Sequence, residues 1–378
     1  MTNRASPVDP DGLLEFSVVF TDRSLNHMSK RFQEVMRDIS TTLREVYNAD
    51  AAVVIPGGGT VGMEAVARQF ATDKNVMVVR NGWFSYRWSQ ILDAGKIPTR
   101  THVMNAARVA DHHQAPFAPP EIEDIVKEIR DRKPDVVFAP HVETSSGIIL
   151  PDDYIKAIAD TVHDFGGLFV LDCIASGAIW VDMGAAGVDV LISAPQKGWS
   201  SSPSSGLVML NEAGVDALSE TTSTSFALDL AKWHQIMQAY LNGGHAYHST
   251  MPTDALAAFR DTLHETRDYG FEKVRAEQEA LGRRVREVLA QRGYASVAAR
   301  GFEAPGVVVS YTDSPAIQNG SAFAAKGMQI AAGVPLQCDE PEDYSTFRLG
   351  LFGLDKLHDV NRSVERLTKV LDAIEQDT

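Results

Sequence analysis

The apolar residues of this chain follow two patterns, helical spacing and short continuous runs. Residues 28–47, "MSKRFQEVMRDISTTLREVY", carry apolar side chains at helical spacing and predict an amphipathic helix. Farther along, short apolar runs alternate with helical segments. "AAVVIP" precedes "VGMEAVARQFA", "NVMVVR" precedes "FSYRWSQILDAG", "DVVFAPHV" precedes "DDYIKAIADTVHDFG", and "LFVLDC" leads through a loop to "VDVLISA". Buried strands separated by helices indicate a mostly parallel sheet with helices on both faces.

A second, smaller unit is predicted after about residue 250. A long charged helix over roughly 252–292 leads to the strand "GVVVSY", a helix near 316–326, the strand "FRLGLFG" and a final helix from about 355. We therefore expect an N-terminal segment over 1–27, a large α/β domain over 28–251, and a small α+β domain over 252–378 that includes the long connecting helix.

Composition narrows the class of protein. The chain has 378 residues, enough for two domains, and its net charge of −15 opposes nucleic-acid binding because no clustered basic face is present. The two cysteines, Cys173 and Cys338, are far apart in sequence and favour a reducing compartment over a disulfide framework. The opening residues resemble no signal peptide, and no apolar run approaches the roughly 18–20 residues of a membrane span. We expect a cytoplasmic protein without a membrane partner.

Candidate chemistry gathers where the predicted strands end, which is where α/β sheets bind ligands. Between the first strand and its helix stands "PGGGT", residues 56–60. Glycines followed by a helix N-terminus can cradle a phosphate, but a plain tight turn is equally compatible with this stretch. The sequence lacks both the Gly-Lys-Ser/Thr ending of a nucleotide P-loop and a G-x-G-x-x-G pattern.

The other strand ends carry an aromatic cluster, hydroxyls, an acid and a lysine. "RNGWFSYRW" follows the second strand, "HVETSSG" follows the third, Asp172 ends "LFVLD", and Gln196 and Lys197 follow "VDVLIS". Taken singly, the aromatic residues are explained by core packing and Asp172 by a helix cap or a satisfied core carboxylate. Taken together, the set matches pyridoxal phosphate, which needs a Schiff-base lysine and an acid for its pyridinium nitrogen. Such a lysine has to be partly desolvated for its amine to be neutral.

Three motifs make the match specific: "HVETSSG", "LFVLDCIAS…VDVLISAPQKG" and "AYHSTMPTDAL…FRLGLFG". With them, nearly the whole chain from about residue 28 resembles class V, fold-type I pyridoxal-phosphate aminotransferases, nearest the alanine/serine–glyoxylate (or pyruvate) branch. The resemblance implies a large mostly parallel seven-stranded type of sheet and pyridoxal 5′-phosphate as cofactor. It also implies ping-pong transfer of the amino group of a small α-amino acid, such as alanine or serine, to a small 2-oxo acid, glyoxylate or pyruvate.

The resemblance also implies a role for each matching residue. Lys197 is the Schiff-base lysine and general base, and Asp172 is the partner of the pyridine nitrogen. Arg348 binds the substrate α-carboxylate. The remaining cofactor-binding positions are Gly58, Gly59, Thr60 and Gln196 at the phosphate, Phe84 stacked on the ring with Trp83 as its rival, Thr144 and Ser176 around the ring, and Tyr247 and Thr250. Because Tyr247 and Thr250 reach the neighbouring subunit's phosphate in this family, a homodimer with shared sites is implied.

Some features depart from the family or allow other interpretations. The family's opening Pro-Gly-Pro segment is absent, and in "RSLNHMSKRF" Asn26 and His27 either face the substrate or cap a helix. Cys338, ten residues before Arg348, leaves open a cysteine desulfurase or another lyase of the same fold, although the neighbouring acids raise the pKa of a thiol. A catalytically dead scaffold would tolerate loss of Lys197 or Asp172, and both are present. His112 and His113 have no partner at metal-ligand spacing, which favours a solvated loop.

Overall fold

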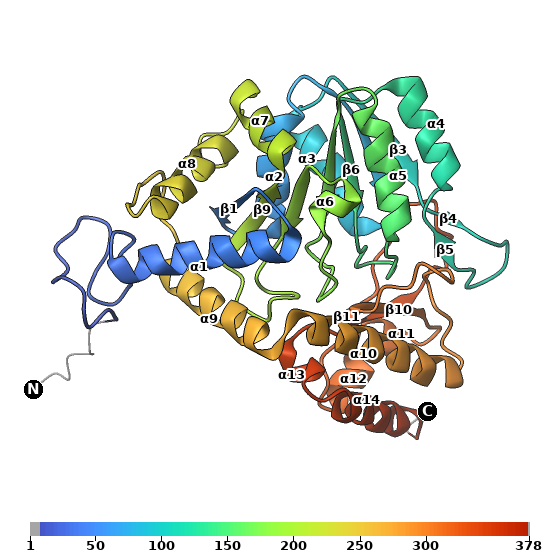
Figure 1. Ribbon diagram of the computed structural model, residues 1–378. Coiled ribbons are helices and arrows are strands. Elements are labelled where there is room, and N and C mark those ends of the chain that lie inside the picture. Colours follow the sequence, from blue (N-terminus) through green and yellow to red (C-terminus); the bar gives the residue numbers. More distant parts are fainter. Residues whose placement is uncertain (1–7, 377–378) are drawn as a thin grey trace, which may run out of the picture.

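The computed structural model describes residues 8–376 and is built around a seven-stranded sheet in the order β1-β9-β8-β7-β6-β2-β3 (Figure 1). Its strands are β1 (Ala51–Pro56), β2 (Asn75–Arg80), β3 (Arg100–Asn105), β6 (Val136–Pro140), β7 (Leu168–Asp172), β8 (Val190–Ser193) and β9 (Ser205–Leu210). Only β9 runs antiparallel to its neighbours in this sheet. Every residue of β6, β8 and β9 is buried, as expected for strands covered on both faces. The predicted fold class is confirmed.

Helices connect these strands and cover the sheet. They are α1 (Lys30–Tyr47), α2 (Gly59–Phe70), α3 (Trp83–Gly95), α4 (Ile122–Arg132), α5 (Asp152–His163), α6 (Met183–Ala186), α7 (Glu212–Glu220) and α8 (Leu230–Leu241). The amphipathic pattern over 28–47 corresponds to α1, in which the Ser29 hydroxyl caps the N-terminus by accepting a hydrogen bond from the Phe32 backbone N at 3.1 Å. Helix α2 begins shortly after the carboxyl end of β1, and α3 begins shortly after the carboxyl end of β2.

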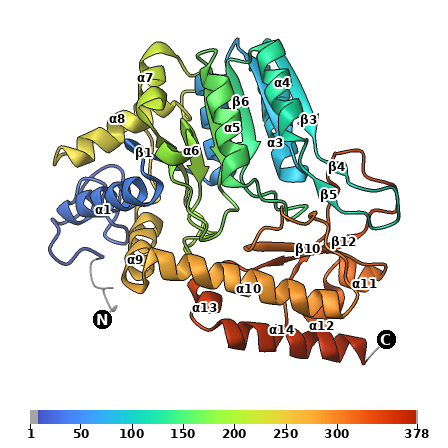
Figure 2. The ribbon, with the colours of Figure 1, turned by 45° about the vertical axis from the view of Figure 1, so that its right-hand side comes forward.

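The C-terminal part of the chain forms a smaller sheet that lies beside the large one (Figure 2). Its strands β10 (Val307–Tyr311), β11 (Ala331–Ala332) and β12 (Thr346–Gly350) pair antiparallel in the order β10-β12-β11. Helices α10 (Phe271–Gln291) and α14 (Val360–Glu375) pack against each other below this sheet. The short helices are α11 (Pro315–Gln318), α12 (Ser321–Ala325) and α13 (Leu354–Leu357).

The prediction of one long helix over 252–292 is wrong in one respect. The segment is two helices, α9 (Thr253–Tyr269) and α10, which meet at Gly270. Gly270 has φ +100°, a conformation that interrupts the helix and that side-chain-bearing residues rarely adopt. The break lets α9 pack on α1 while α10 packs on β10 and α14. The helix expected near 316–326 is likewise divided, into α11 and α12, at Gly320 with φ +80°.

The remaining two-stranded sheet joins β4 (Ala107–Arg108) to β5 (Phe117–Ala118). Strand β5 contacts the C-terminal part of the chain, since Phe117 donates its backbone N–H to the Val297 carbonyl at 2.7 Å. No helix among residues 8–376 is long and apolar enough to cross a membrane.

Candidate active site

Asp172, at the carboxyl end of β7, is the buried acid of the site. Its side chain is only 8% exposed, and Oδ1 accepts a hydrogen bond from the Ile174 backbone N at 2.9 Å. Burial raises the pKa of Asp172 to about 7, and the nearby Arg87 and Lys197 charges oppose that rise. A protonated pyridine nitrogen is the kind of cation that would stabilise this carboxylate, so Asp172 fits the role expected of it.

Lys197 lies in the turn after β8, on the same edge of the sheet. Burial lowers the pKa of Lys197, and the positive charges of Arg348 and Arg87 lower it further, while Asp172 acts in the opposite direction. Its Nζ lies 5.3 Å from the centre of the Phe352 ring, which belongs to the small domain. A partly desolvated amine among like charges loses its proton more easily, which favours the neutral nucleophile that a Schiff base requires.

The N-terminus of α2 supplies an anion-binding turn. Its first helical residue is Gly59 and its N-cap, Gly58, has no side chain to cap the helix, so these backbone N–H groups depend on another acceptor. A Cβ on Gly59 would lie 2.6 Å from Ile174 Cδ1, whereas a Cβ on Gly58 would meet nothing within 4 Å. The turn is therefore packed closely on the loop after Asp172 but open at Gly58.

Gln196 adds an unsatisfied group to this region. Its Oε1 is buried and has no hydrogen-bond partner among the described residues. An orphaned buried polar atom of this kind is explained when a bound polar group completes the site. The free helix N-terminus and the open face at Gly58 together fit a bound phosphate ester. Gln196 can donate to a phosphate only through its Nε2 group, because Oε1 is an acceptor and needs a donor of its own.

Phe84 lies in the first turn of α3, near two guanidinium groups. The Cζ atom of Arg87 is 5.0 Å from the centre of its ring, and that of Arg348 is 5.6 Å away. Trp83 instead packs against Tyr86, with ring centres 5.7 Å apart. The arrangement favours Phe84 over Trp83 as the ring that faces a cofactor.

Glu143 fixes this first turn, and the sequence reasoning missed it. The Glu143 side chain is fully buried, and its carboxylate accepts hydrogen bonds from the backbone N of Phe84 at 3.1 Å and of Ser85 at 2.8 Å. It also accepts from the hydroxyls of Ser85 at 2.7 Å and Ser145 at 2.8 Å. Glu143 belongs to the "HVETSSG" motif, but only the fold shows that its side chain reaches the N-terminus of α3.

The two expected hydroxyl positions lie after β6 and β7. Ser176 Oγ is 2.7 Å from Nδ1 of the buried His141, which joins the two strand ends. Burial lowers the pKa of His141 to about 3, with Arg275 acting in the same direction, so this imidazole is neutral at physiological pH. Thr144 is half-buried in the turn that holds Glu143.

Arg348 projects from β12 of the small domain and is half-buried. Its Nε donates to the Ala332 carbonyl at 2.8 Å, and it forms no ion pair with any carboxylate of residues 8–376. Burial lowers the pKa of Arg348, and Glu143 opposes that shift. The two Nη groups can present a flat pair of donors to a carboxylate.

Tyr247 and Thr250 stand apart from this cluster. They lie in the loop between α8 and α9, where Tyr247 is 54% exposed and its hydroxyl bonds only to Thr250 Oγ1, at 3.1 Å, within the described chain. Asn26 does not face the strand ends either, because it donates to Glu15 at 2.8 Å and accepts from the Met28 backbone N at 2.8 Å. His27 is buried with its ring 5.6 Å from that of Tyr247.

Cys338 does not have the surroundings of a nucleophile. The residue is 4% exposed, and its Sγ donates to the Arg80 carbonyl at 3.4 Å. Burial, together with the charges of Glu143 and Glu340, raises the pKa of Cys338 to about 12. The thiol is therefore protonated at physiological pH, unlike the thiolate that a desulfurase needs.

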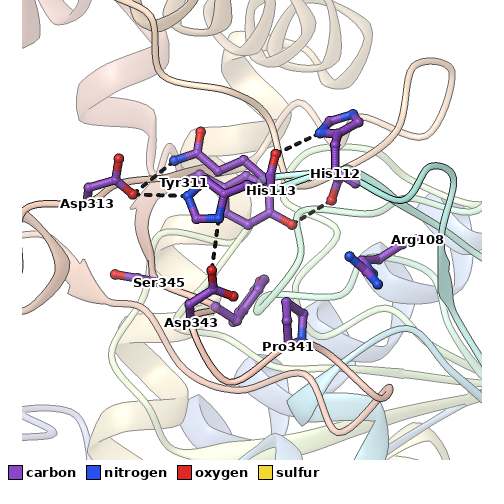
Figure 3. Close-up of a pocket in the computed structure, with 11 residues that line it drawn as sticks. Arg108, His112, His113, Tyr311, Asp313, Pro341, Asp343 and Ser345 are labelled. Carbon is purple, nitrogen blue, oxygen red and sulfur yellow. Dashed lines mark hydrogen bonds and ion pairs between the residues drawn. The ribbon is translucent and has the colours of Figure 1, made fainter.

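The paired histidines line a small pocket between the β4–β5 loop and the small domain (Figure 3). His113 lies between two acids of the small domain, with Nδ1 3.0 Å from Asp343 and Nε2 3.4 Å from Asp313. Among residues 8–376 no group of three or more His, Cys, Asp or Glu side chains is placed to hold a metal ion. These contacts join the β4–β5 loop to the C-terminal part of the chain.

Comparison with known proteins gives the class of this protein. The family described as "Aminotransferase class-V" matches residues 15–334, and the chain belongs to that family, as the sequence predicted. It is accordingly an enzyme that transfers nitrogenous groups, and the family is pyridoxal-phosphate-dependent.

The individual relatives reported below share between 20% and 27% of their residues with this chain. The chain is 27% identical over 345 residues, covering 89% of its length and 88% of the relative's, to a 2-aminoethylphosphonate–pyruvate transaminase of Paraburkholderia phymatum. Two crystal structures share the fold. A ureidoglycine–glyoxylate aminotransferase of Bacillus subtilis has a TM-score of 0.78 at 22% identity, covering 93% of this chain and 87% of that one. An alanine–glyoxylate aminotransferase of Nostoc sp. has a TM-score of 0.75 at 20% identity, covering 93% and 89%.

Proposed function

We propose that this aminotransferase uses pyridoxal 5′-phosphate to move the amino group of a small α-amino acid, such as alanine or serine, to glyoxylate or pyruvate. The observation that carries the proposal is the pairing of the Asp172–Lys197 site with Arg348. Arg348 has donors available beside Phe84 and no carboxylate partner among the described residues. A half-buried guanidinium is stabilised by an anion, and a substrate carboxylate supplies one with two parallel hydrogen bonds.

The residues of the chain divide the chemistry between them. When bound, pyridoxal phosphate supplies an electron sink for the carbon that carries the amino group. The Asp172 carboxylate would hold the proton on the pyridine nitrogen, and its burial strengthens that charge interaction. Lys197 Nζ would first attach the cofactor and then act as general base for the substrate α-proton. Arg348 would hold the carboxylate so that this proton faces Lys197.

The phosphate would be bound by the N-terminus of α2 and its neighbours. Gly58, Gly59 and Thr60 offer backbone N–H groups, and Gln196 offers the Nε2 donor of its side-chain amide. Phe84 would stack on one face of the pyridine ring. Thr144 and Ser176 would supply hydroxyls around it.

A homodimer with shared sites completes the proposal. Tyr247 and Thr250 are exposed and bonded only to each other within residues 8–376, as expected for groups that act in a neighbouring subunit. We also propose a cytoplasmic location and the domain division at 28–251 and 252–378. Cys173 and Cys338 are unpaired and buried, which suits a reducing compartment.

A second donor class is supported by the relatives. Several of them are 2-aminoethylphosphonate–pyruvate transaminases, and a phosphonate is an anion that a guanidinium can also bind. The test is a donor panel of alanine, serine and 2-aminoethylphosphonate against pyruvate and glyoxylate, with the oxo product measured. We expect alanine or serine to give the highest kcat/KM. Turnover of 2-aminoethylphosphonate alone would contradict the α-amino-acid assignment, and no turnover of any pair would contradict the proposed function.

A further inference from the structure

Arg87 is a cation at the phosphate end of the site that none of the roles above explains. It lies on α3 three residues after Phe84, and its Nη1 donates a hydrogen bond to Thr60 Oγ1 at 2.9 Å. Residues three apart on a helix lie on the same face, so Arg87 projects beside the Phe84 ring, 5.0 Å from its centre. The contact joins the first turn of α2 to the second turn of α3.

Arg87 carries a positive charge that has no ion-pair partner among residues 8–376. Arg87 is half-buried. Its field nevertheless reaches both the Asp172 carboxylate and the Lys197 amine, because it shifts the pKa of each. The guanidinium keeps further donors after the bond to Thr60.

The bond to Thr60 also orients the hydroxyl. A threonine hydroxyl has one hydrogen to donate, and accepting from Arg87 leaves that hydrogen free to point elsewhere. Thr60 stands at the N-terminus of α2, where the backbone N–H groups already favour an anion. Arg87 and the Thr60 hydroxyl are therefore adjacent donors at a helix N-terminus that favours an anion.

We infer that Arg87 is a cofactor-binding residue that donates to the phosphate group of pyridoxal phosphate and orients the Thr60 hydroxyl toward it. The inference rests on the proposed use of this cofactor. It gives the two arginines beside Phe84 different tasks: Arg87 binds the anion at the cofactor end, and Arg348 binds the anion at the substrate end. A purely structural clamp between α2 and α3 is the other interpretation of the same contacts.

The experiment compares pyridoxal phosphate with pyridoxal, which lacks the phosphate. Dissociation constants of both compounds are measured by absorbance titration of the apo protein, native and Arg87→Gln. Loss of a charge-assisted contact to the phosphate should weaken pyridoxal phosphate binding about 10- to 100-fold. Binding of pyridoxal should stay within about twofold of native. The matched control is Arg130→Gln, which removes the same charge from an exposed position of α4 and should change neither constant.

Two further variants sharpen the result. Thr60→Val should weaken pyridoxal phosphate selectively, and its effect should be smaller in the Arg87→Gln background because the two groups act together. Arg87→Lys keeps the positive charge but not the paired donors of the guanidinium, so its loss of pyridoxal phosphate affinity should be intermediate. This variant replaces Arg87→Gln in the test if the glutamine variant does not fold. Equal weakening of pyridoxal and pyridoxal phosphate would overturn the inference in favour of the clamp. Native affinity in both Arg87 variants would overturn it outright. Failure of the native protein to bind pyridoxal phosphate would instead contradict the proposed function.

Discussion

Glu143 accepts two hydrogen bonds from Ser85, one from its backbone N at 2.8 Å and one from its hydroxyl at 2.7 Å. The acid comes from the turn after β6, and the serine comes from the first turn of α3. A carboxylate at a helix N-terminus satisfies orphan N–H groups and is stabilised by the helix dipole. The position of Phe84, one residue earlier, therefore depends on a side chain from another strand.

Replacing Glu143 by Gln should destabilise the protein, because one carboxylate oxygen becomes an NH₂ group facing donors. We expect the free energy of unfolding to fall by about 2–3 kcal/mol, measured by urea denaturation of the apo protein. The control is Glu121→Gln, at the N-cap of α4, where the side chain makes no capping bond. That change should cost less than about 0.5 kcal/mol. Equal effects of the two substitutions would show that Glu143 does not anchor α3.

The raised pKa of Asp172 predicts a pH-dependent cost in the apo protein. The folded protein holds this proton up to about pH 7, whereas an unfolded Asp loses it near pH 4. Stability attributable to the protonated form is therefore complete below about pH 4 and is lost as the pH rises through 7. Asp172→Asn mimics the protonated acid, so its stability advantage over native apo protein should grow between pH 5 and pH 8. We expect a gain on the order of 2–4 kcal/mol, measured by chemical denaturation at both pH values.

The cofactor should reverse that ranking. With a ring cation opposite it, the Asp172 carboxylate becomes favourable, so the native protein should bind the cofactor more tightly than Asp172→Asn does. The Asp172→Asn variant should also lose most of its turnover. A denaturation profile for Asp172→Asn that runs parallel to the native one from pH 5 to pH 8 would show that the carboxyl is not buried as an acid.

Lys197 should carry the cofactor. The native protein should be yellow, and borohydride should fix the cofactor irreversibly to the peptide that contains Lys197, as determined by mass spectrometry. Lys356 is a suitable control, because it lies near Phe352 in the small domain yet bonds to the Phe352 carbonyl at 2.9 Å and is not expected to react. Labelling at any lysine other than Lys197 would overturn the assignment.

Shared sites should be visible by complementation. Lys197→Ala and Tyr247→Ala should each be inactive as homodimers, but mixing them should restore part of the activity because one site of the heterodimer carries neither change. Activity is followed after partial unfolding and reassembly, with unmixed samples treated alike. A fully active monomer in solution would contradict this prediction.

Local patterns in the sequence were sufficient to predict the sheet and the positions of Asp172 and Lys197 at its strand ends. Asp172 and Lys197 each follow a buried apolar run, and parallel strands bring such ends to one edge. Glu143 and Arg87 were missed because their importance lies in contacts between α3 and other elements, which spacing along the chain does not encode. The break at Gly270 was missed for another reason: an isolated glycine is tolerated within a helix. Only the packing of α9 on α1, and of α10 on β10 and α14, shows that this glycine ends a helix.

Arg348 provides the most direct test of substrate class. Its Nε is already bonded to the Ala332 carbonyl, which fixes the plane of the guanidinium and leaves its outer edge for a carboxylate. Lysine has a single ammonium group and cannot reproduce two parallel hydrogen bonds. In Arg348→Lys, kcat/KM for α-amino acids should therefore fall roughly 30- to 1000-fold, about 2–4 kcal/mol, while the yellow colour of bound cofactor remains.

The comparison with other amines decides what the arginine recognises. Simple amines without an anionic group should be poor substrates of the native enzyme and nearly insensitive to Arg348→Lys, because they never use the contact. If the guanidinium binds both anions, Arg348→Lys should lower the activity toward a phosphonate-carrying donor as much as it lowers the activity toward α-amino acids. Steady-state kinetics over the three donor classes separate these cases. Amino-acid kinetics within about threefold of native, less than about 1 kcal/mol, would mean that Arg348 does not bind the carboxylate, and the α-amino-acid assignment would fail with it.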